Sequence, residues 1–337
     1  MLRHLLVPLD GSSLAEAILP PTCYLARRLQ ASITLLHVIE ENSPSRVHGE
    51  THLSRPAEAR AYLERVQQEL HEQGIQVTYH VHEAAEGDVA RSIVRHAEEF
   101  GNDLIMLSTH GSSGVRNLLI SSIAQQVLGT GTTPVFVIHP EAGASARAGA
   151  EAGAGGEGRA KETGPGVRPF RCQRLAIPLD MKPHHEESLP LACELAAACH
   201  ASLSLVTVVP RRNDLSGSEG ASGRLLPLTA RAALEVRERE AREYLQQVAA
   251  RLQMTCLQQA SSQQTSNREF VPPATSWRVI RGEPASALVS FFTDARIDLV
   301  VIASHALPAW QAFWEGSVTP RLLTQWRRPV LLVKARN

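Results

Sequence analysis

Short apolar runs alternate with longer segments of helical periodicity along the first 140 residues. The apolar runs are rich in aliphatic and β-branched side chains, which is typical of buried strands. Five strands are predicted, at residues 5–9, 31–39, 76–82, 103–107 and 134–138. Four amphipathic helices are predicted between them, at about residues 13–29, 56–73, 87–100 and 121–128. This alternation predicts a parallel sheet with helices on both faces.

The second half of the chain repeats this pattern. Residues 175–180 match residues 5–10, and residues 201–208 match residues 31–38, both at an offset of 170. The offset then grows to 182 at Tyr244, which answers Tyr62, and to 195 in four later pairs. Those pairs are Gly87 and Gly282, Asp103 and Asp298, Ser122 and Ser317, and Pro134 and Pro329. We infer a duplication.

The drift in offset predicts two insertions in the second copy, of 12 and 13 residues. They flank its second helix, the first between Arg211 and about Thr229 and the other between about Gln253 and Ser276. Residues 141–169 are rich in Ala, Gly, Glu and Arg and are interpreted as a flexible linker. The predicted organisation is therefore a domain at 1–140, a linker at 141–169 and a second domain at 170–337.

Composition narrows the class of protein. Lys plus Arg and Asp plus Glu number 34 each, which gives no support for a nucleic-acid or anionic-membrane partner. The N-terminus lacks the features of a signal peptide, and no apolar run reaches the ~18 residues of a membrane span. Five cysteines lack C-x-x-C spacing: Cys23, Cys172, Cys193, Cys199 and Cys256. We expect reduced, mostly structural thiols and a cytoplasmic location.

The strand order 3-2-1-4-5 would place a ligand site between strands one and four, beyond their carboxyl ends. Asp10 follows the first strand and would face the loop that begins at Ser108, with Val38 nearby at the end of the second strand. Asp10 suits a ribose and Val38 a base, while backbone amides around Gly111 and Ser122 suit phosphates.

Each of these interpretations has a plainer competitor. Asp10 fits a turn with a helix cap equally well, and Val38 taken alone is more simply strand core. His110 and its counterpart His305 have no ligand set nearby, and His184 and His185 show no zinc spacing, so no metal site is predicted. The charged segment 235–242 is most simply a solvated face. Three bulky aromatic side chains are most simply core or interface: Trp310, Phe313 and Trp314.

The motif spacing resembles that of nucleotide-binding universal stress proteins. Their pattern is Gly-x-x-Gly, nine residues, then Gly-Ser or Gly-Thr, preceded by an Asp after strand one and a Val late in strand two. The first half has Ser108-Thr-His-Gly111, nine residues, then Ser121-Ser122. The second half has Ala303-Ser-His-Ala306, nine residues, then Gly316-Ser317. The chain thus resembles two universal stress protein domains in tandem, everywhere except the linker and the insertions.

This resemblance implies two flavodoxin-like, Rossmann-like α/β domains, each a five-stranded parallel sheet of order 3-2-1-4-5 with helices on both faces. It also implies binding of ATP or a related adenine nucleotide, accompanied by Mg²⁺. The implied first-half residues are Asp10, Val38, Ser108, His110, Gly111, Ser121 and Ser122. The matching second-half residues are Asp180, Val208, Gly316 and Ser317.

Departures from the motif point to the first half as the binding site. Ala306 replaces the middle glycine and adds a Cβ beside the expected phosphate path, and Pro308 removes an N–H donor. The first half keeps Gly111 at that position. The resemblance further implies an intramolecular pseudo-dimer, with residues 134–138 facing residues 329–333, and leaves further homo-oligomerisation open.

The predicted function is that of a non-enzymatic, nucleotide-responsive stress protein. A nucleotide-independent scaffold with degenerate sites is the alternative that the broken glycine pattern favours. An ATP-consuming adenylating enzyme is disfavoured. The sequence has no Ser-Gly-Gly-x-Asp-Ser loop, no Walker Gly-Lys-Ser/Thr and no nucleophile paired with a base.

Overall fold

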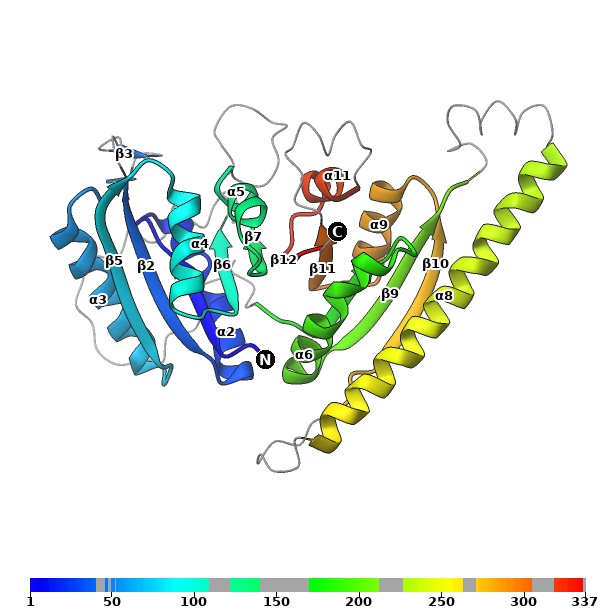
Figure 1. Cartoon of the computed structure of the whole chain (residues 1–337), viewed down its shortest axis with the longest axis horizontal. Helices are drawn as coiled ribbons and strands as arrows, with labels where there is room; N and C mark the ends of the chain where they lie inside the picture. The colour runs from blue at the N-terminus through cyan, green and yellow to red at the C-terminus, as the bar shows by residue number, and fades with distance from the viewer. Residues whose placement is uncertain are drawn as a thin grey trace, which may run out of the picture. The chain divides into compact units, whose positions relative to one another are not determined.

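A computed structural model describes residues 1–40, 46–47, 50–51, 53–108, 122–139, 170–211, 227–262, 271–304 and 318–335. The chain divides into two compact units, one containing residues 2–171 and the other residues 172–337 (Figure 1). We call them the first and second units. The predicted linker 141–169 lies outside the described residues, and the predicted domain limits stay a prediction.

The first unit is a parallel sheet with the predicted strand order. Its strands are β1 (His4–Pro8), β2 (Ser32–Glu40), β5 (Val77–Glu86), β6 (Leu104–Ser108) and β7 (Val135–Ile138). Their spatial order is β5-β2-β1-β6-β7, which is 3-2-1-4-5 in chain order. A separate short pair joins β3 (Arg46–Val47) to β4 (Glu50–Thr51). The predicted α/β fold is confirmed.

Helices cover both faces of this sheet. They are α1 (Ser13–Glu16), α2 (Leu19–Leu29), α3 (Pro56–Glu72), α4 (Val89–Glu99) and α5 (Ser122–Thr130). On one face, Arg27 Nη2 of α2 donates to Gln73 Oε1 at the end of α3, over 2.8 Å. The helices α4 and α5 pack against each other on the opposite face (Figure 1).

The predicted helix at 13–29 is wrong in one respect, because it is two helices. The helix α1 ends at Glu16, and α2 begins at Leu19 with Pro20 and Pro21 in its first turn. Proline has no N–H to donate to the carbonyl four residues earlier, so the helical hydrogen-bond ladder of α1 cannot continue through these positions.

The second unit repeats the arrangement. Its strands are β8 (Arg174–Pro178), β9 (Ser202–Val209), β10 (Thr275–Arg281), β11 (Leu299–Ser304) and β12 (Val330–Lys334). They follow the order β10-β9-β8-β11-β12. Its helices are the 3-10 helix η2 (Pro183–Ser188) and α6 (Leu189–Cys199), α8 (Pro227–Ser262), α9 (Pro284–Asp294) and α11 (Val318–Gln325).

The register corrects the predicted size of the second insertion. Ile33 pairs with Val77 in the first unit, and Leu203 pairs with Thr275 in the second, so the offset at the third strand is 198. The predicted 13 residues are therefore three too few. The strand β5 is three residues longer than β10, with ten residues against seven, and its register with β2 shifts by two residues after the pair of Val38 and His82.

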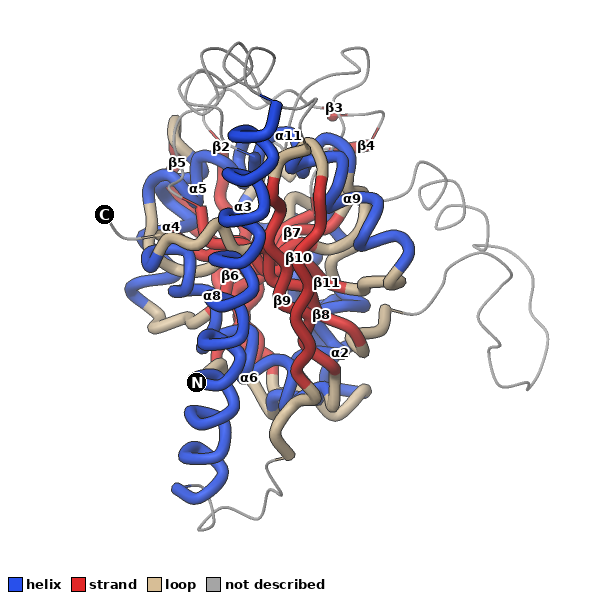
Figure 2. The backbone as a smooth tube through the Cα atoms, turned by 90° about the vertical axis from the view of Figure 1, so that its right-hand side faces the viewer, coloured by secondary structure: helices blue, strands red, loops and turns tan. Residues whose placement is uncertain are grey.

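Residues 227–229 of the first insertion and residues 253–262 of the second belong to one helix, α8, whereas residues 271–276 of the second lead into β10. The helix α8 has 36 residues, whereas its counterpart α3 has 17. It runs beside β9 and β10 of its own unit (Figure 2). An ion pair at helical spacing joins Arg231 to Glu235, both exposed, in keeping with the predicted solvated face. Glu238, which pairs with Arg242 on the same helix, is only 14% exposed.

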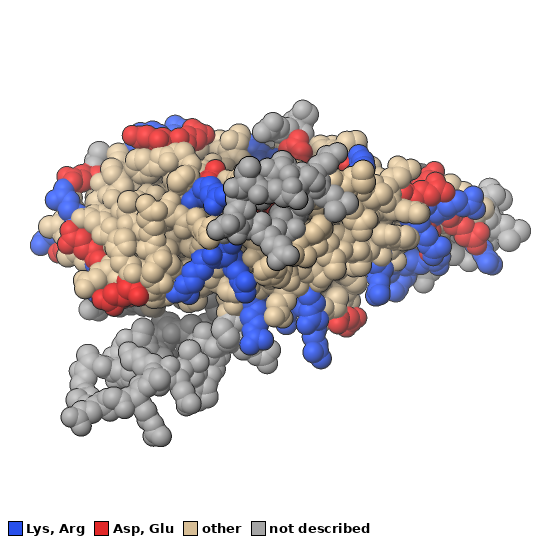
Figure 3. Space-filling view, turned by 90° about the horizontal axis from the view of Figure 1, so that it is seen from below, with Lys and Arg blue, Asp and Glu red and all other residues tan. Residues whose placement is uncertain are grey.

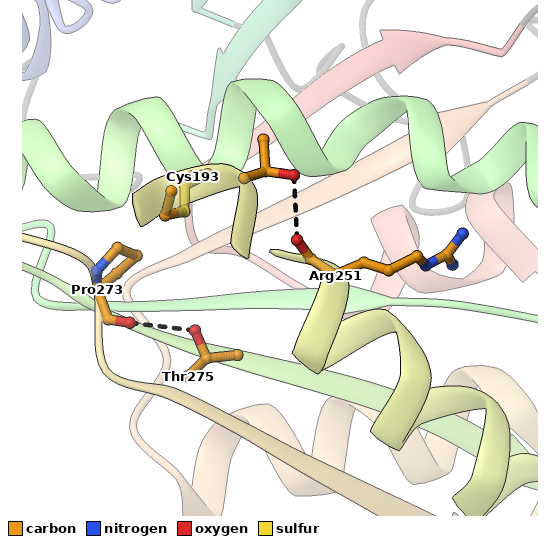
Figure 4. The surroundings of a disulfide bond; sticks show 6 residues. Cys193, Arg251, Pro273 and Thr275 are labelled. Carbon is orange, nitrogen blue, oxygen red and sulfur yellow. Dashed lines mark hydrogen bonds between the residues drawn. A yellow bond between two sulfur atoms is a disulfide. The ribbon is translucent and has the colours of Figure 1, made fainter. Parts of the chain in front are cut away.

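The prediction of reduced thiols is wrong for one pair of cysteines. Cys193 on α6 and Cys256 on α8 form a disulfide across a sequence separation of 63 residues (Figure 4). The first unit has Cys23 at the position of Cys193 but Gly74, beyond the end of α3, at the position of Cys256. The extension of α8 brings the second sulfur to α6, and this pairing has no signature in local cysteine spacing. Cys23, Cys172 and Cys199 are buried and do not take part in the disulfide.

Charges of both signs appear across the visible face in Figure 3, as expected from equal numbers of acidic and basic residues. Among the described residues, no helix is long and apolar enough to cross a membrane.

Candidate functional site

The central strands of the first unit separate toward their carboxyl ends. The strands β1 and β6 pair only at Leu5 with Leu104 and at Leu6 with Ile105, although β6 continues to Ser108. On its other side, β1 stays paired with β2 as far as Pro8. From β1 the chain continues to β2 and β5 on one side of the sheet, and then to β6 and β7 on the other side. Open α/β sheets bind ligands at such a switch point. The separation occurs where the sequence predicts the site.

Asp10 lies two residues beyond β1 and organises the turn into α1. Its Oδ1 accepts hydrogen bonds from Ser12 N at 2.9 Å and Ser12 Oγ at 2.6 Å. Ser12 Oγ in turn accepts from Ala15 N at 3.1 Å, which makes Ser12 the helix cap. Gly11 has a φ of +88°, and a Cβ there would lie 2.7 Å from a side-chain carbon of Leu53. The turn and cap interpretation is confirmed, and the ribose role of Asp10 stays a prediction.

Val38 and Ser108 lie at the ends of β2 and β6. Val38 is 7% exposed and belongs to the core. Ser108 Oγ is buried and has no hydrogen-bond partner among the described residues. An unsatisfied buried hydroxyl costs about 1–3 kcal/mol, so such a group in a native protein calls for a partner. A ligand above the end of β6 would supply one.

The remaining first-unit candidates lie mostly outside the described residues. This applies to His110, Gly111 and Ser121, whereas Ser122 is the first residue of α5. Gly316 and Ser317 of the second unit also lie outside. Their phosphate-binding roles stay predictions.

The second unit surrounds its equivalent aspartate with cationic and ionisable groups. Asp180 Oδ1 accepts hydrogen bonds from His185 Nδ1 at 2.5 Å and from Lys182 N at 3.2 Å. The ammonium of Lys182 lies 3.6 Å from Asp180 Oδ2. Burial raises the pKa of Asp180, but the hydrogen bond and charge of His185, together with Lys182, lower it below its ordinary value.

The two units also differ at two other equivalent positions. Ala303 stands where the first unit has Ser108, so the second unit has no hydroxyl there. Val208, the counterpart of Val38, is half-exposed in β9 rather than buried. The second unit therefore keeps the strand separation, with β8 and β11 paired only at Leu175 and Ala176, but not the same side chains around it.

A buried polar side chain holds the end of the first strand in each unit. His37 Nδ1 lies 2.7 Å from the carbonyl oxygen of Leu9, and Thr207 Oγ1 donates to that of Leu179 over 2.9 Å. Both side chains are 1% exposed. His37 Nε2 also lies 3.0 Å from the carbonyl oxygen of Leu53. Sequence analysis missed this pair, although a polar residue inside an apolar strand is a signal that could have identified it.

A tyrosine accompanies the aspartate in both units. Burial, followed by the nearby carboxylate of Glu16, raises the pKa of Tyr62 well above its usual range. Burial and Glu186 do the same to the pKa of Tyr244. Both phenols therefore stay protonated at neutral pH. The sequence repeat identified these tyrosines as equivalent positions but gave no role for them.

Comparison with known proteins decides the family. The model of the universal stress protein family matches residues 1–139 and 172–334, which is most of the chain. The chain belongs to the universal stress protein family. The two matched regions correspond to the two copies inferred from the sequence.

Curated universal stress proteins match a single copy. YxiE of Bacillus subtilis is 25% identical over 152 residues, which is 41% of this chain and 99% of YxiE. A universal stress protein of Methanocaldococcus jannaschii, MJ0577, is 25% identical over 157 residues, covering 41% of this chain and 95% of that protein.

Solved structures resemble the chain over nearly its whole length. A functionally unknown protein from Pseudomonas aeruginosa has a TM-score of 0.62 at 15% identity, covering 99% of this chain and 93% of that one. A universal stress protein from Archaeoglobus fulgidus has a TM-score of 0.58 at 14% identity, with coverages of 99% and 97%. At this identity the likeness shows the fold.

Proposed function

We propose that the first unit binds ATP or a related adenine nucleotide above the carboxyl ends of β1 and β6. The observation that carries the proposal is the separation of these strands beyond Leu6 and Ile105. At its edge lies the buried hydroxyl of Ser108, which has no hydrogen-bond partner within the described part of the chain. Membership of the universal stress protein family and the intact motif spacing from Ser108 to Ser122 support the same ligand.

In this proposal each residue contacts a different part of the nucleotide. Asp10 receives the ribose, Val38 lies beside the base, and the amides around Gly111 and Ser122 bind the phosphates with Mg²⁺ as counter-ion. Ser108, His110 and Ser121 complete the loop. Close approach of the backbone to a phosphate is easiest where no Cβ intervenes, which supports Gly111 over Ala306 as the working position.

The second unit is proposed as a site that no longer binds nucleotide. Asp180 is hydrogen-bonded to His185 and approached by the Lys182 ammonium, so a ribose hydroxyl would have to displace a charged or strongly hydrogen-bonded partner. The missing hydroxyl at Ala303 and the changes at Ala306 and Pro308 act in the same direction.

The protein is proposed to act without catalysis, as a cytoplasmic stress-response protein whose state depends on bound nucleotide. The absence of a recognisable catalytic motif in the sequence supports this. Incubation with ATP and Mg²⁺ should release no free phosphate above a Gly111→Trp control. Sustained release that Gly111→Trp abolishes would make the protein an ATPase.

Calorimetric titration with ATP and Mg²⁺ tests binding. Wild type is expected to bind one nucleotide per chain, and Gly111→Trp none. Ser108→Ala should bind several-fold more weakly, because it removes the hydroxyl without adding bulk. No heat for wild type, or unchanged affinity in Gly111→Trp, would overturn the proposal in favour of a nucleotide-independent interaction module.

We further propose that the two copies pair within the chain through residues 134–138 and 329–333. Two complete copies on one chain, and the resemblance to proteins that pair through their last strands, support this. After cleavage at a protease site inserted within residues 141–169, the two fragments should co-elute in size-exclusion chromatography. Separate elution of folded fragments would contradict the pairing.

A further inference from the structure

Three imidazole rings meet on one face of the first unit's sheet. His80 and His82 are two residues apart on β5, so their side chains leave the strand on the same face. His96 comes from α4 and lies with its ring centroid 5.0 Å from each of the other two. One potential ligand atom from each residue lies within 4.8 Å of the others. Nitrogen donors from a strand and a helix therefore converge at one point.

His96 is oriented by the backbone of its own helix. Its Nδ1 lies 2.7 Å from the carbonyl oxygen of Ser92, one turn earlier. A carbonyl oxygen only accepts, so Nδ1 carries the proton and Nε2 presents a lone pair. Metal-binding histidines are commonly held in this way, with one ring N–H donated to a carbonyl or carboxylate. The ring of His96 is thus held in a fixed tautomer, with Nε2 available as a metal ligand.

The cluster has a closed side and an open side. His96 is 3% exposed, whereas His80 and His82 are half-buried. The guanidinium of Arg95 lies 3.5 Å from His82 Nε2, but Arg95 is on the exposed surface of α4. A bound cation would repel this flexible side chain into solvent. An ion could therefore enter from the solvent side and retain a water molecule there.

The equivalent place in the second unit has no such donors. By register and helix position, His80, His82 and His96 correspond to Arg278, Ile280 and Phe291. The Arg278 guanidinium lies 5.7 Å from the centre of the Phe291 ring. The fold therefore fills this position without histidine, and the three donors are particular to the first unit.

Aromatic packing alone is the competing explanation. Phe100 does pack against the cluster, with its ring centroid 5.2 Å from that of His80, edge to face, and 5.4 Å from that of His96. Packing is satisfied by apolar side chains, as Phe291 shows in the second unit. It does not account for three nitrogen donors converging.

We propose that His80, His82 and His96 bind one Zn²⁺ ion, with water as the fourth ligand. Neutral imidazole suits zinc, and sites with three histidines and an open position are an established zinc geometry. Zn–N bonds of about 2.0–2.1 Å place tetrahedral donors about 3.3 Å apart, so donor atoms that now lie up to 4.8 Å apart need to close by about 1.5 Å at most. The site is separate from the proposed nucleotide site in its residues, and the inference does not rest on nucleotide binding.

Competition with a chromophoric zinc chelator tests the site in the full-length protein. Wild type is expected to bind Zn²⁺ at this site, and the double variant His80→Gln, His82→Gln to lose one equivalent or bind it at least 100-fold more weakly. The matched control is His71→Gln, since His71 is exposed on α3 of the same unit and the chemical change is identical. It should bind as wild type does.

Cobalt provides a readout of the ligands themselves. Co²⁺ in a tetrahedral nitrogen site gives visible absorption bands, which are expected in wild type and His71→Gln but not in the double variant. Circular dichroism of the double variant should match wild type, because both replaced side chains lie toward the surface. Undiminished Zn²⁺ binding with unchanged Co²⁺ bands in the double variant would overturn the proposal, as would a wild type that binds no Zn²⁺.

Discussion

The two units share one backbone plan but surround their equivalent aspartates differently. Asp10 takes part in a turn with Ser12, whereas Asp180 is hydrogen-bonded to His185 and approached by Lys182. Both lie two residues beyond a first strand that separates from the fourth. The comparison teaches that the fold supplies the place for a ligand, while a few side chains decide whether that place can be used.

The same lesson applies at the third strand. Three histidines in the first unit stand where the second unit has Arg278, Ile280 and Phe291. The second unit has instead acquired a longer helix and a disulfide. The two copies are thus frameworks of the same topology that carry different side chains at equivalent positions.

The largest expected effect concerns the disulfide, which only the second unit has among the described residues. Reduction, or Cys256→Ser, should lower the free energy of unfolding of the second unit by about 2–4 kcal/mol, because a cross-link restricts the unfolded chain. All four tryptophans lie beyond residue 172, so tryptophan fluorescence in urea reports this unit alone. Identical midpoints with and without reductant would contradict the pairing of Cys193 with Cys256.

The next largest effect is the loss of stability on replacing His37 or Thr207 by alanine. His37→Ala removes contacts to two carbonyl oxygens and leaves a buried cavity, so the first unit should lose about 2–3 kcal/mol. Thr207→Ala should cost the second unit about 1 kcal/mol, since it removes one hydrogen bond. Urea unfolding followed by far-UV circular dichroism should show the loss of stability in both variants. Unfolding followed by tryptophan fluorescence should show only the loss in Thr207→Ala. Equal losses would show that the contact with Leu53 adds nothing.

The smallest expected effect is the loss of stability on breaking an ion pair between a helix and the third strand, which each unit has. Glu238 on α8 pairs with Arg281 and Arg242 and is 14% exposed, whereas Glu83 on β5 pairs with Arg60 and is 53% exposed. The hydrogen bond from Arg281, despite some burial, lowers the pKa of Glu238. Glu238→Gln should cost about 1 kcal/mol at pH 7, and Glu83→Gln less than about 0.5 kcal/mol.

The sign of the pH dependence follows from the lowered pKa. Because folding favours ionised Glu238, its contribution is complete above the unfolded pKa and is lost as pH falls through the folded one. The difference in the free energy of unfolding between wild type and Glu238→Gln, measured in urea, should therefore shrink toward zero in the acid range below about pH 4. A difference that persists unchanged there would show that packing rather than charge stabilises this contact.

The alternation of apolar runs with amphipathic segments predicted the strands, and matched segments at constant offsets predicted the duplication. The strand order followed from the resemblance to universal stress proteins. The elements that the sequence patterns missed depend on long-range contacts. The disulfide needs α8 to extend to Cys256, and the double contact of His37 depends on the placement of Leu53. The histidine cluster had a visible signal, two histidines spaced by two in the predicted strand 76–82, but its third member comes from a separate helix.

The candidate nucleotide site was predictable as a position rather than as a set of contacts. Strand order fixes where β1 and β6 part, and the structure has Asp10, Val38 and Ser108 beside those strand ends. The loop residues from His110 to Ser121 lie outside the described part of the chain, so their roles rest on motif spacing.

The asymmetry between the units is tested most directly by calorimetric titration of ATP into two matched variants, Asp10→Ala and Asp180→Ala. We predict that Asp10→Ala weakens binding at least tenfold, or about 1.4 kcal/mol, while Asp180→Ala binds as wild type does, with one nucleotide per chain. Loss of binding in Asp180→Ala, with Asp10→Ala unaffected, would contradict the account.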